Sequence, residues 1–446
     1  MSARLAVRRL LFLLTIAALS AATGCQRPFL VATPNVLLRE DPEKVFAACP
    51  AGCQGPDMEI LYATDRDAIE SEPGPSGSGV SRAIAYSERR VISYGYGRAR
   101  RLAFGTATVM LDPQPTWQEL VADSLRAERR QAYALRAGPT KQLGSFDPKL
   151  HHLQPCSGGV QLASEAVSDF MVQQRNFQGL LTDRLAGSPQ KDVYIFVHGY
   201  NNSFDDSLFR AAEVWHFLGR TGVPVVYSWP AGYPGIRGYA YDRESGEFTV
   251  FHLKYFLQMV ASTPGVERIH IVAHSRGTDV AITALRELHI AYKAAGKSTQ
   301  DELKLENLVL AAPDLDEDVF MQRFVAENLL KAAHRTTIYT STNDKAIGLA
   351  DLIFASKRRI GLLGPRDFSP EARQTLSKLP NLQFVDCKVS RFSTSHDYVF
   401  ANPAALSDLI LVLRDRRSPG VEHGRPLLQP VQGVWELHDD YPARKQ

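Results

Sequence analysis

One serine stands where an apolar strand pattern changes into a helical pattern. Ser275 lies in IHIVAHSRGTDVAI (residues 269–282), between His274 and Arg276. This turn matches the nucleophile elbow, Gly-x-Ser-x-Gly, with Ala273 in place of the first glycine. Small residues are needed there because neighbouring backbones approach closely, and alanine is still small. We therefore expect Ser275 to be a nucleophile; the alternative is a serine that only caps the following helix.

The backbone near this serine offers donors for a developing oxyanion. The N–H of Arg276 would lie at the start of the helix, where backbone donors and the helix dipole favour negative charge. In IFVHGYNNS (195–203), a His-Gly pair follows an apolar run, as it does in lipases and esterases. The N–H of Tyr200 is then the natural second donor. We interpret His198 as a structural residue that braces this loop, rather than as a base.

The elements that must position these groups follow a regular alternation. Continuous apolar segments indicate buried strands, and amphipathic segments between them indicate helices. These segments, with the polar residues that close some of them, span residues 192–199, 223–229, 267–275, 305–314, 335–344 and 381–389. Such an alternation predicts a parallel sheet covered by helices on both faces. In a sheet of this kind the carboxyl ends of the strands form the site, and polar residues follow several of the segments.

The chain from residue 58 to 415 resembles a bacterial family of largely uncharacterised, esterase/lipase-like α/β-hydrolases. The blocks that carry the resemblance stand in the family's order: LYATDR, RLAFGTATV, FVHGYNNSFDDSLFRAA, YSWPAG, YDRES, RIHIVAHSRG, LVLAAPDLDEDVF, YTSTNDKAI and SHDYVF. The resemblance implies an α/β-hydrolase fold, with a mostly parallel central sheet and helices on both faces. It also implies a catalytic triad in the chain order serine, acid, histidine.

That order assigns the remaining members of the triad. His396 in STSHDYVF is the last histidine of the core and would be the base that takes the proton of Ser275. Asp344 in YTSTNDKAI follows a late strand and occupies the usual position of the acid. Asp314 in LAAPDLDEDVF follows the strand before it and is the alternative acid. Either aspartate could instead be a helix cap, a role that suits Asp316 especially well.

The resemblance favours a carboxylic ester hydrolase that acts on a small-molecule or lipid ester through an acyl-enzyme. An acyltransferase with the same triad is an alternative, because both reactions share the acyl-enzyme. A non-catalytic envelope protein that binds a partner is a second alternative, which the departure at Ala273 supports. The chemistry needs no cofactor, and we expect no metal site. The net charge of +3 over 446 residues gives no reason to expect a nucleic-acid partner.

The N-terminus has the pattern of an export signal. Three arginines precede an apolar run from Leu10 to Leu19, which is short for a membrane span, and small residues follow. The small residues end in Ala-Thr-Gly-Cys at positions 22–25, which resembles a bacterial lipobox although its first position is usually leucine. We expect residues 1–25 to be a signal peptide and Cys25 to be lipidated. By resemblance to Gram-negative lipoproteins, Gln26 after the cysteine favours the outer membrane, facing the periplasm.

The remaining boundaries follow from composition. Residues 26–57 are predicted to be a tether, residues 58–415 the hydrolase domain and residues 416–446 a polar, peripheral tail. The stretch 354–380 is long for a strand connection and could form a cap over the site. The aromatic stretch 229–245 could wall a pocket, or it could be a connection in which Asp242 pairs with Arg243.

Export would expose the other four cysteines to an oxidising compartment. Cys49 and Cys53 lie close together in CPAGC and could bridge locally. Cys156 and Cys387 would then join distant segments. Sequence alone leaves all three pairings of four cysteines open.

Overall fold

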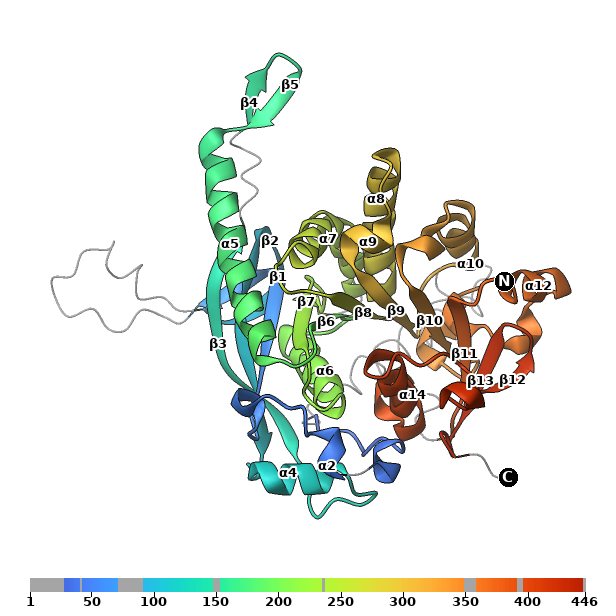
Figure 1. Ribbon diagram of the computed structural model, residues 1–446. Coiled ribbons are helices and arrows are strands. Elements are labelled where there is room, and N and C mark those ends of the chain that lie inside the picture. The colour runs from blue at the N-terminus through green and yellow to red at the C-terminus, as the bar shows by residue number, and fades with distance from the viewer. Residues whose placement is uncertain are drawn as a thin grey trace, which may run out of the picture.

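Figure 1 shows the computed structural model of the chain. The structure describes residues 28–40, 42–70, 91–146, 153–234, 237–348, 358–390 and 396–443. The expected signal peptide, with Cys25, and residues 354–357 of the expected cap lie outside these ranges.

Thirteen strands and eleven α-helices are found in the described part of the chain. The strands are β1 (Met58–Glu70), β2 (Val91–Asp112), β3 (Ala134–Phe146), β4 (Leu153–Cys156), β5 (Gly159–Leu162), β6 (Asp192–Val197), β7 (Val223–Ser228), β8 (Arg268–His274), β9 (Leu305–Ala311), β10 (Arg335–Thr340), β11 (Leu382–Lys388), β12 (Leu428–Val431) and β13 (Val434–His438). The helices are α2 (Pro42–Val45), α4 (Trp117–Ser124), α5 (Ser164–Gly187), α6 (Phe204–Phe217), α7 (Gly238–Ala261), α8 (Gly277–Ala294), α9 (Thr299–Leu303), α10 (Glu317–Phe320), α12 (Pro370–Leu376), α13 (Tyr398–Ala401) and α14 (Pro403–Leu413). Among these helices, none is long and apolar enough to cross a membrane.

The described strands other than β4 and β5 form a single sheet. Its order is β12-β13-β11-β10-β9-β8-β6-β7-β1-β2-β3. Neighbours from β13 to β1 run parallel, whereas β12 at one edge and β2 and β3 at the other are antiparallel to their neighbours. The predicted mostly parallel sheet is confirmed. The carboxyl ends of its parallel strands all lie on the same side of the sheet, which brings the loops that follow them together.

Side chains of each central strand enter two different cores. On β6, Val193, Ile195 and Val197 join one buried cluster, and Tyr194 and Phe196 join the other. This split follows from the pleat, because successive side chains point to opposite faces of a sheet. Helices α5, α7 and α8 cover the first face, and α4, α6 and α14 cover the second. A strand buried on both faces must be apolar throughout, which explains the unbroken apolar segments of the sequence.

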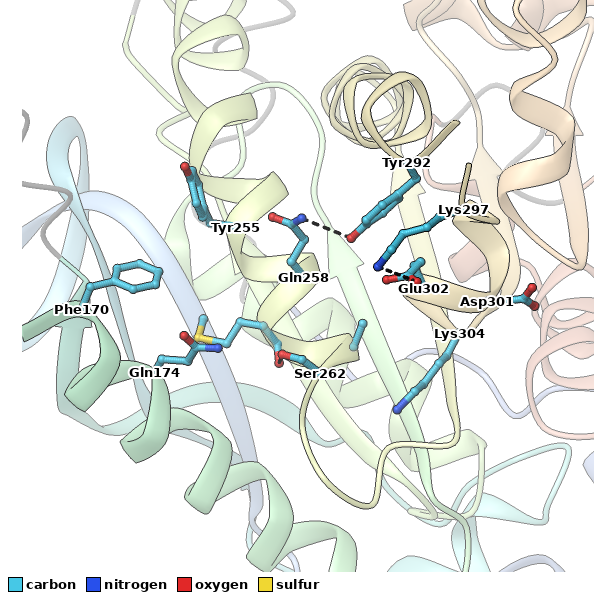
Figure 2. Close-up of a pocket in the computed structure, with 12 residues that line it drawn as sticks. Phe170, Gln174, Tyr255, Gln258, Ser262, Tyr292, Lys297, Asp301, Glu302 and Lys304 are labelled. Carbon is cyan, nitrogen blue, oxygen red and sulfur yellow. Dashed lines mark hydrogen bonds and ion pairs between the residues drawn. The ribbon is translucent and has the colours of Figure 1, made fainter. Parts of the chain in front are cut away.

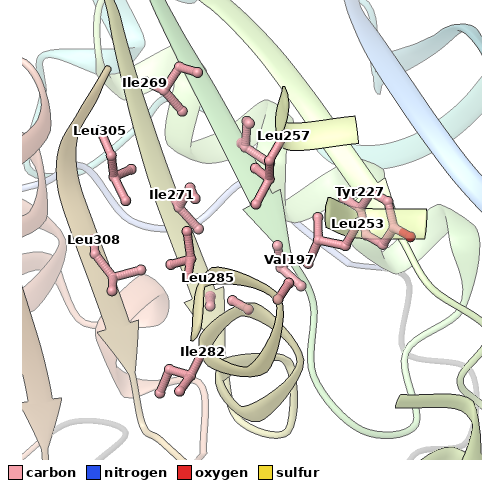
Figure 3. Packing of buried hydrophobic residues seen from close by; sticks show 14 of the residues in the cluster. Val197, Tyr227, Leu253, Leu257, Ile269, Ile271, Ile282, Leu285, Leu305 and Leu308 are labelled. Carbon is pink, nitrogen blue, oxygen red and sulfur yellow. The ribbon is translucent and has the colours of Figure 1, made fainter. Parts of the chain in front are cut away.

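The packing of α8 fixes the turn at the end of β8. Figure 3 shows Leu285 of α8 beside Ile271 of β8, and Ile282 of α8 and Leu253 of α7 belong to the same buried cluster. All four side chains are buried, and each stabilises the fold by about 1.5–3 kcal/mol relative to its exposed state. The start of α8 is therefore held firmly against the strand that precedes it.

The segment expected to be a tether packs against the domain. Leu30, Leu37 and Phe46 are buried in the second core. The backbone of Leu30 donates to the carbonyl of Tyr133, beside the start of β3. The prediction for residues 26–57 is wrong over residues 28–57, because the apolar residues of this segment find partners on α6 and β3 that local sequence does not reveal.

The expected polar tail is also part of the fold. Strand β13 pairs in parallel with β11, and β12 pairs with β13. Arg425 is buried and donates to both carboxylate oxygens of Asp408 on α14, at 2.9 and 2.7 Å, and to Gln383 on β11 at 2.6 Å. The prediction of a peripheral tail is therefore wrong. Arg425, whose charge would be expected in solvent, is neutralised by Asp408 inside the core.

None of the possible disulfides is present in the described ranges, where all four cysteines are free. Cys156 is exposed on the β4–β5 hairpin, which projects from the body of the molecule, whereas Cys387 is buried on β11 at the other end of the sheet. The thiol of Cys49 instead donates to the carbonyl of Pro50 at 3.6 Å. Burial raises the pKa of the Cys49 thiol to about 11.

Candidate active site

Ser275 occupies a sharp turn between β8 and α8. Its backbone φ is 53°, in the left-handed region, which costs a non-glycine residue about 1–3 kcal/mol. Hydrogen bonds on both sides of the residue hold this conformation. The Ser275 N–H donates to the carbonyl of Ala311 at 2.9 Å, and the Ser275 carbonyl accepts from the Asp314 N–H at 3.3 Å and from the Thr278 hydroxyl at 2.6 Å. The helix cap is Arg276, without a side-chain capping bond, so a capping role does not explain Ser275.

Two glycines allow the turn to approach the loop after β6. A Cβ on Gly277 would lie 2.2 Å from the carbonyl oxygen of His198, and one on Gly199 would lie 2.7 Å from the Cβ of Ser275. Neither position can carry a side chain without moving backbone. Ala273 has room because it lies within β8, paired with Val197 and Leu310, and its methyl group joins the first core. The departure from the elbow pattern at Ala273 therefore fits the turn.

Two backbone donors flank the serine. Tyr200 directly follows Gly199, which contacts the serine, and Arg276 directly follows the serine itself. Within the described ranges, the N–H groups of Tyr200 and Arg276 have no hydrogen-bond acceptor. Unpaired backbone donors beside a buried hydroxyl are what an oxyanion hole requires.

The structure pairs His396 with Asp344. The Nδ1 atom of His396 lies 2.7 Å from Oδ2 of Asp344, and the other carboxylate oxygen accepts from the N–H groups of Ala346 and Ile347 at 3.0 and 3.1 Å. The Asp344 side chain is fully buried and that of His396 is 23% exposed. Because a carboxylate only accepts, Nδ1 of His396 carries the proton and Nε2 is left to act as a base.

Each partner shifts the pKa of the other. Burial lowers the pKa of His396, but the hydrogen bond and charge of Asp344, with smaller contributions from Asp397 and Asp314, raise it above the ordinary histidine value overall. Burial raises the pKa of Asp344, but His396 and the two N–H groups outweigh it and hold that pKa below its usual range. The pair therefore favours an ionised carboxylate beside a histidine that readily accepts a proton.

Asp314 has other partners. Its carboxylate forms an ion pair with Arg359 at 3.1 Å and accepts from the hydroxyl of Tyr239 at 2.8 Å. Arg359 belongs to the segment expected to be a cap, and Gly361 of that segment donates to the carbonyl of Pro313 at 3.1 Å. The described part of this segment therefore forms a wall beside the serine turn, held by Asp314.

His198 is buried as a brace, as predicted. Its ring stacks on Trp229 with centroids 5.1 Å apart, and its Nδ1–H donates to the carbonyl of Gly199 at 2.9 Å. Its Nε2 accepts from Arg66 at 3.1 Å. Burial and the charge of Arg66 lower the pKa of His198 well below its ordinary value, so the ring is neutral.

Two charged residues hold this loop: Arg66, which nothing in the sequence analysis singled out, and Asp242, whose role differs from the one suggested by the sequence. Arg66, buried at the end of β1's parallel region, also donates to the carbonyls of Asn202 and Ala231 at 2.7 and 2.8 Å. Asp242, for which a pairing with Arg243 was one alternative, accepts from the backbone N–H groups of Asn201 and Gly232. The sequence signal that could have found Arg66 is its positive charge shortly after the apolar part of a predicted strand.

A cavity of about 680 Å³ lies away from this site, between α5, α7, α8 and α9 (Figure 2). Its lining includes Tyr255 near the end of α7 and Tyr292 near the end of α8. Both helices start beside the serine turn. The length of α8 from its start to Tyr292 therefore places the cavity roughly 20 Å from Ser275, toward the amino ends of the parallel strands. It is therefore not the cleft of the serine.

Comparisons with known proteins agree with the fold. No curated protein matches the chain. The profile of a family described as "Alpha/beta hydrolase of unknown function (DUF900)" matches residues 173–416, more than half of the chain, and the match includes Ser275, Asp344 and His396. Both the fold and the uncharacterised family expected from the sequence are confirmed. The chain belongs to this family of α/β-hydrolases.

Proposed function

We propose that the protein is a serine hydrolase that cleaves carboxylic esters through an acyl-enzyme. The observation that carries the proposal is the 2.7 Å hydrogen bond between His396 and Asp344, next to a serine in a strained turn. The ring of His396 lies 4.8 Å from that of His274, the residue directly before Ser275. Ser275, Asp344 and His396 lie in the loops after β8, β10 and β11. Their order across the sheet is therefore the same as their order in the chain: serine, aspartate, histidine.

The chemistry assigns each group one task. The Oγ atom of Ser275 forms a bond to the ester carbonyl carbon while its proton passes to Nε2 of His396. The carbonyl electron pair moves onto oxygen, which the N–H groups of Tyr200 and Arg276 stabilise. As the carbonyl re-forms, the bond to the alcohol oxygen breaks and the alcohol leaves with the proton from His396. Asp344 remains ionised and stabilises the imidazolium.

The second half of the reaction regenerates the serine. His396 removes a proton from water, the water oxygen attacks the acyl carbon, and Ser275 leaves with the proton that His396 returns. The products are a carboxylic acid and an alcohol. We propose a small-molecule or lipid ester as the substrate, in keeping with the resemblance to esterases and lipases.

Labelling with a fluorophosphonate tests the proposal on the detergent-solubilised full chain. Wild type should be labelled and Ser275→Ala should not. Ser298→Ala is the matched control, since Ser298 caps α9 far from the site. A folded wild type, checked by circular dichroism, that takes no label would refute the proposal. So would labelling that survives in Ser275→Ala.

We further infer that Cys25 carries a lipid and that the enzyme faces the periplasm from the outer membrane. This inference rests on the arginine-rich start, the short apolar run and the Ala-Thr-Gly-Cys sequence. One acyl chain gives only weak attachment, but several chains on one cysteine would anchor the protein stably.

A further inference from the structure

His274 lies where three loops of the site meet. It ends β8 directly before Ser275, and its side chain is buried. Gly199, in the loop after β6, lies so close that a Cβ added to it would be 3.2 Å from Nδ1 of His274. On another side, its ring contacts His396, with centroids 4.8 Å apart, and the edge of Phe400 at 5.4 Å. One side chain thus contacts the proposed oxyanion loop and the proposed base.

The polar contact of His274 goes to the backbone of the base. Its Nε2 lies 3.1 Å from the carbonyl oxygen of His396. A carbonyl only accepts, so His274 is the donor and its proton is on Nε2. The nearest carboxylate, Asp397, lies 3.8 Å from the same nitrogen and is itself paired with Arg210 at 3.0 Å. The donated hydrogen bond is therefore the direct contact that fixes the ring.

A buried histidine needs a reason at this position. Burial, and next the charge on His396, lower the pKa of His274 to about 4, so the ring is neutral near neutral pH and cannot replace His396 as a base. An apolar ring would fill the same space without the cost of burying polar atoms. What histidine adds over an apolar ring is the N–H that donates to the carbonyl of His396.

We propose that His274 is a positioning residue that fixes the imidazole of His396 relative to Ser275. It acts through the hydrogen bond to the His396 carbonyl and through contact with the His396 ring. This role rests on the proposed function. It ties the base loop to the strand that carries the nucleophile, so the two reacting side chains share one rigid support. A misplacement of about 1 Å in such a pair can cost roughly 100-fold in rate.

Three variants of the full chain test this role. His274→Phe keeps a ring but loses the donor, and His274→Gln restores an N–H at similar reach. His270→Phe is the matched control, because His270 is equally buried on the same strand and face but contacts Asn307 and Tyr194 instead. Hydrolysis of p-nitrophenyl acetate is measured for each and normalised to the sites that fluorophosphonate titrates.

His274→Phe should lower kcat per titrated site by about 10- to 100-fold with little change in KM. His274→Gln should recover most of that loss, and His270→Phe should keep the wild-type kcat per site. The proposal is overturned if His274→Phe only reduces the number of titratable sites, or if His270→Phe lowers kcat per site equally.

A spectroscopic arm does not depend on turnover. The Nδ1 proton of His396 should give a low-field NMR signal that Asp344→Asn removes. His274→Phe should broaden or shift this signal, and His270→Phe should leave it in place. An unchanged signal in His274→Phe overturns the positioning role even if the enzyme is active. A wild type without turnover refutes the proposed function, while the signal still tests whether His274 holds His396.

Discussion

The side chain of His396 is bound to Asp344 at 2.7 Å, while Asp314, one strand away, is bound to Arg359 and Tyr239. Two aspartates that the sequence left as alternatives therefore have different partners. We expect Asp344→Asn to lower kcat for p-nitrophenyl acetate by about 10⁴-fold, because the amide no longer holds the correct tautomer. Asp314→Asn should retain most of the activity. The reverse ranking of the two variants would reassign the acid.

The pH dependence of activity follows from the same pair. His396 must be neutral to accept a proton, and its pKa is raised by Asp344 against the effect of burial. Activity should therefore fall as the pH drops through a value above the ordinary histidine pKa of about 6.5. In Asp344→Asn this acid limb of kcat/KM should move to lower pH. Profiles of kcat/KM against pH for wild type and Asp344→Asn measure the two acid limbs. An acid limb at the same pH in both would contradict the assignment.

The same pKa shifts predict opposite effects on stability. Since the pKa of His396 is raised on folding, its contribution is present at low pH and is lost as pH rises through the folded value. Since the pKa of Asp344 is lowered, its contribution is present above the unfolded pKa and is lost as pH falls through the folded value. The pair therefore stabilises the fold most between these two limits.

The tight contact between the serine turn and the loop after β6 predicts a specific effect of added methyl groups. Gly277→Ala should abolish fluorophosphonate labelling, because its Cβ would lie 2.2 Å from the backbone oxygen of His198. Gly179→Ala is the control: it lies within α5 with open space around it, and alanine there should stabilise the helix by roughly 0.5–1 kcal/mol. Equal labelling of both variants would show that the turn can open without loss of function.

The sequence pointed to the serine, the histidine and both aspartates on two grounds. Parallel strands gather their following loops at one end of the sheet, and the resemblance implied the chain order serine, acid, histidine. It placed Asp344 ahead of Asp314 only by the family's usual position of the acid. The physical difference between the two aspartates is Arg359, which comes from a segment far along the chain and pairs with Asp314. The sequence did not identify Arg66, whose partners are backbone carbonyls of two other loops. Contacts of this kind leave no spacing pattern in the sequence.

The two ends of the domain were misjudged for a related reason. Apolar residues near Leu30 and Leu37 are too sparse to form a periodic pattern, yet each meets a partner on the second face of the sheet. At the other end, Arg425 counts as a surface charge until Asp408 is known to lie beside it. Burial that depends on a distant partner is not visible locally.

The integration of the C-terminal segment can be tested directly. Ending the chain at residue 415 removes β12 and β13 and leaves Asp408 as an unpaired buried charge. Removal of one member of a buried ion pair costs about 3–5 kcal/mol, so the truncated protein should unfold at a lower temperature or fail to fold. Arg425→Ala alone should show much of this effect, and Arg417→Ala, at a half-exposed neighbour, should show little. Thermal unfolding followed by circular dichroism measures all three.

Lipid attachment at Cys25 predicts where the protein is found in a Gram-negative cell. Wild type should sediment with the outer membrane, because two or more acyl chains on the N-terminal cysteine anchor a protein stably in a bilayer. Cys25→Ser should remove the acceptor thiol and release the chain from the washed membrane. Cys53→Ser is the control for loss of a cysteine as such, since Cys53 is a free thiol within the folded domain. Incorporation of labelled palmitate into wild type and Cys53→Ser, but not into Cys25→Ser, would identify the site. Wild type found wholly in the periplasmic fraction would instead indicate ordinary signal cleavage, and the hydrolase would meet its ester in solution.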